Sequence, residues 1–163
     1  MLRIIMLSMI FCACLHAEWD PSILIQEHQQ LPKVLHNKHY TSLKTRVKKA
    51  LINSWCSPEK IDLLMDLTYI IKPKVLVDIG AGTGSSLLPI AATLKLANSG
   101  TVFAIDAWSN QEAIKNLGSD DPNRVWWSQV DMRALHLMFT RTITEWSLKK
   151  SCIEINKPSE LAV

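Results

Sequence analysis

The chain has 163 residues, of which 48% are hydrophobic and 20% are charged. This composition is typical of one globular domain that can bury a core, and it excludes a disordered or low-complexity protein. The formal net charge of +3 is too small to indicate a nucleic-acid-binding protein. Seven Lys or Arg residues stand against one acid between residues 31 and 60, which we interpret as a solvated helix face. A patch for anionic lipid, phosphate or nucleic acid is the alternative.

The first 17 residues combine Arg3, an apolar run over residues 4–15 and a small residue, Ala17. This is the plan of a secretory signal peptide, and the apolar run is short for a membrane span. We therefore predict that residues 1–17 are a signal peptide or a membrane anchor, with membrane association through residues 4–15. The protein would then be exported or membrane-anchored. It would be cytoplasmic if the segment is not a working signal, and a buried N-terminal helix is the structural alternative.

Two of the four cysteines, Cys12 and Cys14, lie in this segment. The other two, Cys56 and Cys152, have no C-x-x-C partner and no histidine at the spacing of a metal site, so no zinc site is predicted. We expect buried free thiols. A disulfide between Cys56 and Cys152 stays open, because sequence does not show whether they approach each other.

The following segment, residues 18–56, is predicted to be a helical arm. Its first part is polar and interrupted by Pro21 and Pro32, so it would lie over a domain as a loop or short helices. Its second part has apolar residues at helical spacing, which predicts a docking helix. These apolar positions are Leu43, Val47, Leu51 and Trp55.

Residues 57–163 are predicted to form a domain in which helices and strands alternate. Ser57 and Pro58 provide a helix start, and Pro73 ends that helix. The next run, Lys74–Ile79, is apolar on both faces, as a central parallel strand requires.

A glycine turn leads from this strand into a helix expected over residues 85–97, and a second strand is expected over residues 101–106. Beyond it we expect a helix capped by Ser109, one long helix over residues 124–148 and a third strand over residues 151–156. This order predicts an α/β fold with a parallel sheet and right-handed crossovers.

The glycine turn itself is the strongest functional signal. A strand that turns through glycines into a helix presents free backbone N–H groups at the positive end of the helix. Asp106 ends the second strand, where a carboxylate can accept hydrogen bonds from two ribose hydroxyls. The sequence therefore predicts a site for a nucleoside-containing ligand, and a purely structural turn is the alternative. The turn reads Gly80-Ala81-Gly82-Thr83-Gly84.

Spacing and charge distinguish between such ligands. The dinucleotide fingerprint is G-x-G-x-x-G, whereas the glycines here follow G-x-G-x-G from Gly80 to Gly84. Asp78, two positions before the first glycine, would repel a pyrophosphate but would attract a cationic amino-acid group. These features disfavour a nicotinamide-dependent oxidoreductase.

The segment DIGAGTG, which begins at Asp78, resembles motif I of the class I S-adenosylmethionine-dependent methyltransferases. FAIDAW, which contains Asp106, resembles their second motif, and IDAWSN with the downstream VWW resembles small-molecule O-methyltransferase-like proteins. The resemblance implies S-adenosyl-L-methionine as cofactor, with Asp78 near its methionine moiety, Asp106 on its ribose and Ser159 close to its adenine. The implied cofactor-binding residues are Asp78, Gly80, Ala81, Gly82, Thr83, Gly84, Asp106, Ala107, Trp108 and Ser159.

The resemblance covers residues 57–163 and implies a Rossmann-like sheet of seven strands. This chain ends after the third strand, so we expect a truncated domain that keeps the N-terminal, cofactor-binding half. The other half includes the residues after the fourth strand that normally meet the methyl acceptor, bind a metal or supply a general base, and no catalytic residue is predicted. The first strand would have an unpaired edge and an uncovered apolar face, for which a second chain that completes the sheet is the candidate partner.

These features predict a methyltransferase-like protein that, if intact, transfers a methyl group to an unidentified small molecule. The alternative is an exported, non-catalytic cofactor-binding or interaction protein, since S-adenosylmethionine is a cytoplasmic metabolite. Trp108 is expected either to pack in the core or to flank the adenine, and Trp126 and Trp127 either to pack or to line an acceptor pocket. The five histidines, His136 included, are interpreted as surface residues, and no metal site is predicted.

Overall fold

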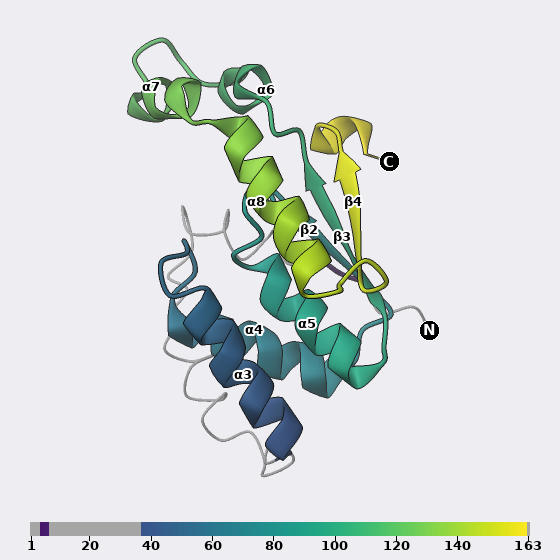
Figure 1. The fold of residues 1–163 in the computed structure, drawn as a ribbon. Coiled ribbons are helices and arrows are strands. Elements are labelled where there is room, and N and C mark those ends of the chain that lie inside the picture. The colour runs from purple at the N-terminus through teal and green to yellow at the C-terminus, as the bar shows by residue number, and fades with distance from the viewer. Residues whose placement is uncertain (1–3, 7–36, 163) are drawn as a thin grey trace, which may run out of the picture.

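The computed structural model describes residues 4–6 and 37–162, which form an α/β structure with a parallel sheet flanked by helices (Figure 1). The longer strands are β2 (Val75–Ile79), β3 (Thr101–Asp106) and β4 (Cys152–Asn156). They are parallel and adjacent in this order. The three predicted strands and their parallel pairing are confirmed.

A short fourth strand, β1 (Ile4–Met6), pairs in parallel with Val75–Val77 of β2. The prediction that this edge of β2 is unpaired is therefore wrong for these three positions. β1 comes from the apolar run that predicted a signal or anchor. The rest of residues 1–17, with Cys12 and Cys14, lies outside the described residues, so export stays a prediction.

α4, which precedes β2, and α5, which follows the glycine turn, have boundary signals in the sequence. Ser57 caps α4 (Pro58–Ile71) by accepting a hydrogen bond from the backbone N–H of Lys60 at 3.3 Å. The helix ends before Pro73. α5 (Leu87–Ala97) ends at Asn98, which has a left-handed backbone with φ of 48°.

The docking helix is shorter than its apolar spacing predicts. α3 (Lys38–Ala50) buries Val47 and packs on α4 and α5. It stops before Trp55, which is 58% exposed and is not part of the docking face. The cause is a local turn, in which the Ser54 hydroxyl accepts from the backbone N–H of Cys56 at 3.3 Å.

Between β3 and β4 the chain forms three helices: α6 (Asn110–Ile114), α7 (Pro122–Gln129) and α8 (Met132–Glu145). The single helix predicted over residues 124–148 is wrong, because the chain breaks at Val130 and Asp131.

The break has a capping signal at its centre. Val130 is extended, and the Asp131 carboxylate accepts a hydrogen bond from the backbone N–H of Ala134 at 2.8 Å, which starts a new helix. Ser109 caps α6 as predicted. After β4, a single 3₁₀ turn, η3 (Ser159–Leu161), ends the described chain.

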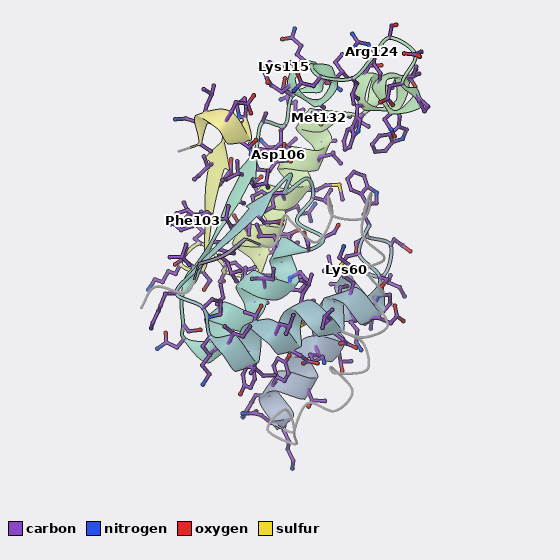
Figure 2. All side chains as sticks on the ribbon, turned by 180° about the vertical axis from the view of Figure 1, so that it is seen from behind. Lys60, Phe103, Asp106, Lys115, Arg124 and Met132 are labelled. Carbon is purple, nitrogen blue, oxygen red and sulfur yellow. The ribbon has the colours of Figure 1, made fainter. Side chains whose placement is uncertain are left out.

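The helices α5 and α8 lie over the same face of the sheet (Figure 1). Glu154 of β4 bonds to His136 of α8, so the neighbouring Ile153 points to the opposite face. The register aligns Val77, Phe103 and Ile153 on that face, and Ile153 is 44% exposed there. Figure 2 views the molecule from this side, where Phe103 is labelled. The predicted apolar sheet face is thus partly open to solvent.

A buried polar group fastens α3 to α4. The Asp66 carboxylate, only 2% exposed, accepts from the Tyr40 hydroxyl at 2.5 Å and pairs with the Lys44 ammonium at 2.9 Å. Burial, reinforced by the hydrogen bond to Asp66, raises the pKa of Tyr40 well above its ordinary value. Tyr40 is therefore a neutral donor at every physiological pH.

We expect Asp66→Ala to destabilise the protein by about 3 kcal/mol, because it leaves the buried Tyr40 hydroxyl without its acceptor and removes the nearer of the two carboxylates that pair with the partly buried Lys44. Urea unfolding followed by circular dichroism measures this change. Arg141→Ala, which removes an exposed ion pair with Glu145, is the control and should leave the unfolding midpoint in place. Equal effects of the two substitutions would contradict the prediction.

Candidate functional site

The glycine turn leads from the end of β2 towards α5 and is hydrogen-bonded to the end of β3. The backbone N–H of Gly80 donates to the carbonyl oxygen of Ile105 at 2.8 Å, and that of Gly84 donates to Ala81 at 2.7 Å. The first bond holds the turn at the carboxyl end of β3, where Asp106 lies, and the second closes the turn on itself (Figure 2). Because crossovers in parallel sheets leave this end free, it is where ligands of such sheets bind.

Two of the glycines are required for different reasons. Gly80 has a φ of 79°, and a Cβ built there would meet no atom within 4 Å, so the space beside it is open to a ligand. Gly84 has a φ of 85°, and its Cβ would lie 2.9 Å from Leu88 and 3.0 Å from Phe139. The first glycine leaves room for a ligand, while the second lets the turn pack against α5 and α8.

Asp106 connects the turn with the chain beyond β3. One carboxylate oxygen accepts from the backbone N–H of Gly82 at 2.8 Å, and the other accepts from that of Trp108 at 2.7 Å. A carboxylate has about four acceptor positions, so about two stay available. Two vicinal hydroxyls of a ribose would use them, and Asp106 therefore fits the predicted role.

Trp108 is held against the turn rather than extended into solvent. Its indole N–H donates to the carbonyl oxygen of Gly82 at 2.9 Å, and the side chain is 8% exposed. Its ring stacks on His136 with centroids 4.3 Å apart and tilts against Phe139 at 5.4 Å. Trp108 thus both packs in the core and lines the pocket described next.

A pocket of about 480 Å³ opens at the ends of the strands. It is the size of a small-molecule or cofactor site. Its walls come from the turn, from the start of α6, from α7 and α8, and from the residues after β4. Six of the predicted residues line it: Gly80, Gly82, Asp106, Ala107, Trp108 and Ser159. Four do not: Asp78, Ala81, Thr83 and Gly84.

Asp78 lies beneath the turn, where it is half-buried. Its carboxylate accepts from the Ser86 hydroxyl at 2.9 Å at the start of α5. Desolvation raises the pKa of Asp78, and the nearby charge of Asp106 adds to this, although the Ser86 hydrogen bond and Lys60 act in the opposite direction. An incoming cation near this carboxylate would compensate for its lost hydration.

Sequence reasoning missed two residues of this region. His136 lies between Trp108 and β4, with its Nε2 atom 2.6 Å from a Glu154 oxygen. Trp55 lines the pocket, and its Cζ3 atom is 3.6 Å from the place of a Cβ on Gly82. Neither has a sequence signal, because each contact joins elements that are distant along the chain.

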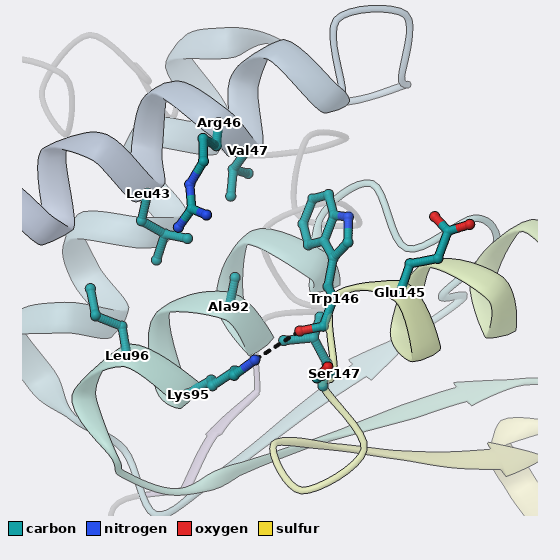
Figure 3. Close-up of a pocket in the computed structure, with 10 residues that line it drawn as sticks. Leu43, Arg46, Val47, Ala92, Lys95, Leu96, Glu145, Trp146 and Ser147 are labelled. Atoms are coloured by element: carbon teal, nitrogen blue, oxygen red, sulfur yellow. Dashed lines mark hydrogen bonds between the residues drawn. The ribbon is translucent and has the colours of Figure 1, made fainter.

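A larger cavity of about 650 Å³ lies between α3, the second half of α5 and the end of α8 (Figure 3). The Lys95 ammonium there donates to the backbone oxygen of Trp146 at 2.9 Å. Arg46 and Glu145 also line it. None of the residues singled out by the glycine turn reaches this cavity, so the smaller pocket is the candidate site.

Residues 4–6 and 37–162 also bear on metal binding, thiol chemistry and membrane insertion. No group of three or more His, Cys, Asp or Glu side chains there could hold a metal ion. Cys56 and Cys152 are buried and free, and burial raises the pKa of the Cys152 thiol to about 12. In the same part of the chain, no helix has the length and apolar character that a membrane crossing requires.

The comparison with known proteins assigns no family to the chain. No protein-family model, curated protein or solved structure matches it. The chemistry of the site therefore rests on the geometry described above.

We expect Asp78→Asn to raise the melting temperature at pH 7. Since the pKa of Asp78 is raised in the folded state, stability falls as pH rises through the unfolded and then the folded pKa, so a penalty is present at pH 7, which lies above the pKa of the unfolded carboxyl. Asparagine still accepts from Ser86 but carries no charge. The advantage of the variant should vanish below the pKa of the unfolded carboxyl, which thermal melts at pH 3 and pH 7 would show. A lower melting temperature at pH 7 would disprove it.

Proposed function

We propose that this chain is a class I S-adenosylmethionine-dependent methyltransferase-like domain that binds S-adenosyl-L-methionine and acts on a small-molecule acceptor. One observation carries the proposal. Gly80 leaves open space in the same pocket that Asp106 lines, and the Asp106 carboxylate keeps about two acceptor positions for ribose hydroxyls.

The arrangement of the sheet supports a Rossmann-like fold as part of this proposal. β2, β3 and β4 are parallel neighbours, and the helices of their crossovers, α5 and α8, lie over one face (Figure 1). In such sheets a nucleotide binds outside the carboxyl ends of the strands. The pocket lies at this end.

The residues present would divide the binding of the cofactor between them. Asp106 would hold the ribose, the turn from Gly80 to Gly84 would approach the cofactor through its backbone, and Ser159 would lie near the adenine. Asp78 would act through its charge from beneath the turn. When bound, the cofactor supplies an activated methyl group, and the protein contributes chiefly by positioning donor and acceptor.

The open sheet face favours a second function, that of a non-catalytic interaction protein. Val77, Phe103 and Ile153 form apolar surface on the face opposite α5 and α8. A second chain packed there would bury this surface. Such a protein could keep the cofactor pocket without catalysing transfer.

The test is calorimetric titration of the full-length chain with S-adenosylhomocysteine, with NAD as the control ligand. We expect saturable binding of S-adenosylhomocysteine alone, and we expect Asp106→Ala to abolish it, since the ribose loses its acceptor. Asp120→Ala removes an exposed acid from the loop before α7 and should bind as the native chain does. If Asp106→Ala stays folded by circular dichroism and keeps its affinity, the site assignment fails.

Two glycine substitutions separate the cofactor role of the turn from its packing role. We expect Gly80→Ala to weaken S-adenosylhomocysteine binding at least tenfold, because its methyl group fills the open space meant for the ligand. The stability loss should be only about 1 kcal/mol, because it comes from the positive φ alone and the methyl group meets no protein atom. Gly84→Ala should instead lose about 2–4 kcal/mol of stability, because its methyl group overlaps Leu88 and Phe139. Calorimetry and urea unfolding of both variants measure this. The reverse ranking in stability would refute it.

A further inference from the structure

Three tryptophans form an exposed aromatic cluster beside the glycine turn. The ring centroids of Trp126 and Trp127 are 4.5 Å apart, and Trp55 lies 5.9 Å from the first and 6.4 Å from the second. Trp55 is 58% and Trp126 49% exposed. A contiguous exposed apolar patch of this kind is typical of a binding surface.

The cluster continues directly into the candidate pocket. Trp55 and Trp127 line the same pocket as Gly82 and Asp106. The Trp55 ring covers the turn, because its Cζ3 atom lies 3.6 Å from where a Cβ on Gly82 would stand. A molecule resting on the rings would therefore lie at the mouth of the pocket.

The backbone of α7, which carries Trp126 and Trp127, is anchored to α6 and the chain after it. The Asn110 amide of α6 donates to the backbone oxygens of Trp127 at 2.7 Å and Val130 at 2.8 Å. The Arg124 guanidinium of α7 donates to the backbone oxygen of Leu117 at 2.7 Å, just after α6. A rigid surface loses little conformational entropy when it binds.

Charged side chains of both signs line the pocket, and among them are Lys115 and Lys157. Of the carboxylates that line it in the described chain, Glu112 and Glu160 both pair with Lys115, at 3.3 and 3.4 Å. The third, Asp106, accepts two backbone N–H bonds. The free acceptor positions of Asp106 are assigned to the ribose, and the lining lysines disfavour a cation beside the rings.

We propose that Trp55, Trp126 and Trp127 bind the methyl acceptor, and that this acceptor is a flat aromatic molecule without a positive charge that stacks on the exposed rings. The inference rests on the proposed function, to which it adds the class of the second substrate. Stacking on an exposed aromatic side chain contributes enough affinity for its loss to be measured.

The test is calorimetric titration of the full-length chain with 2-naphthol. The controls are 2-decalol, which has a saturated skeleton of similar size, and choline, a quaternary ammonium. We expect saturable binding of 2-naphthol only, weakened about tenfold by Trp55→Leu and by Trp126→Leu. Trp146→Leu, which alters a tryptophan of the other cavity, should leave the affinity unchanged.

Equal binding of 2-decalol, tighter binding of choline, or full affinity in both cluster variants would each overturn the inference. S-Adenosylhomocysteine is titrated separately. If it binds and 2-naphthol does not, the inference fails and the proposed function stands. If 2-naphthol alone binds through Trp55 and Trp126, the aromatic site stands and the cofactor assignment fails.

Discussion

The pair of hydrogen bonds accepted by Asp106 is the constraint on which the candidate site depends. Through Gly82 the carboxylate holds the turn after β2, and through Trp108 it holds the chain that leaves β3. The indole of Trp108 then returns to the carbonyl oxygen of Gly82. Two loops from neighbouring strands are thereby closed into one rigid unit around a single carboxylate.

This unit carries a backbone conformation that is unfavourable in isolation. Trp108 has a φ of 40°, in the left-handed region that a large L-residue seldom adopts. Its two hydrogen bonds and its stack on His136 offset that strain. His136 is in turn held by Glu154, so the geometry at the end of β3 depends on the packing of α8 against β4. The geometry of the site therefore depends on the packing of the core.

The break between α7 and α8 gives the pocket its outer wall. A single straight helix from residue 124 to residue 148 could not place Trp126 and Trp127 beside Trp55 while keeping Phe139 against Gly84. The cap at Asp131 permits the change of direction, and Asn110 fixes it by bonding to the last turn of α7. The Asp131 cap and the Asn110 hydrogen bond together set the position of the helix that carries Trp126 and Trp127.

The sequence by itself determined the three main strands, the helix starts at Ser57 and Ser109, and the carboxylate that ends β3. Each depends on signals contained within a few residues, namely apolar runs, capping side chains and glycines that accept a positive φ. The order of these elements was also sufficient for a parallel sheet. Asp106 was identified in the same way, because strand ends are local features.

Only the tertiary structure decided the rest. The pairing of β1 with β2, the position of Trp55 over Gly82 and the contact of His136 with Glu154 all join segments far apart in the chain. Helical spacing assigned Trp55 to α3, because periodicity does not record where a turn competes with the helix. Asp78 lies beneath the turn, since strand alternation and the Ser86 hydroxyl direct its side chain there. Contacts of this kind depend on how the elements pack, which local sequence patterns do not encode.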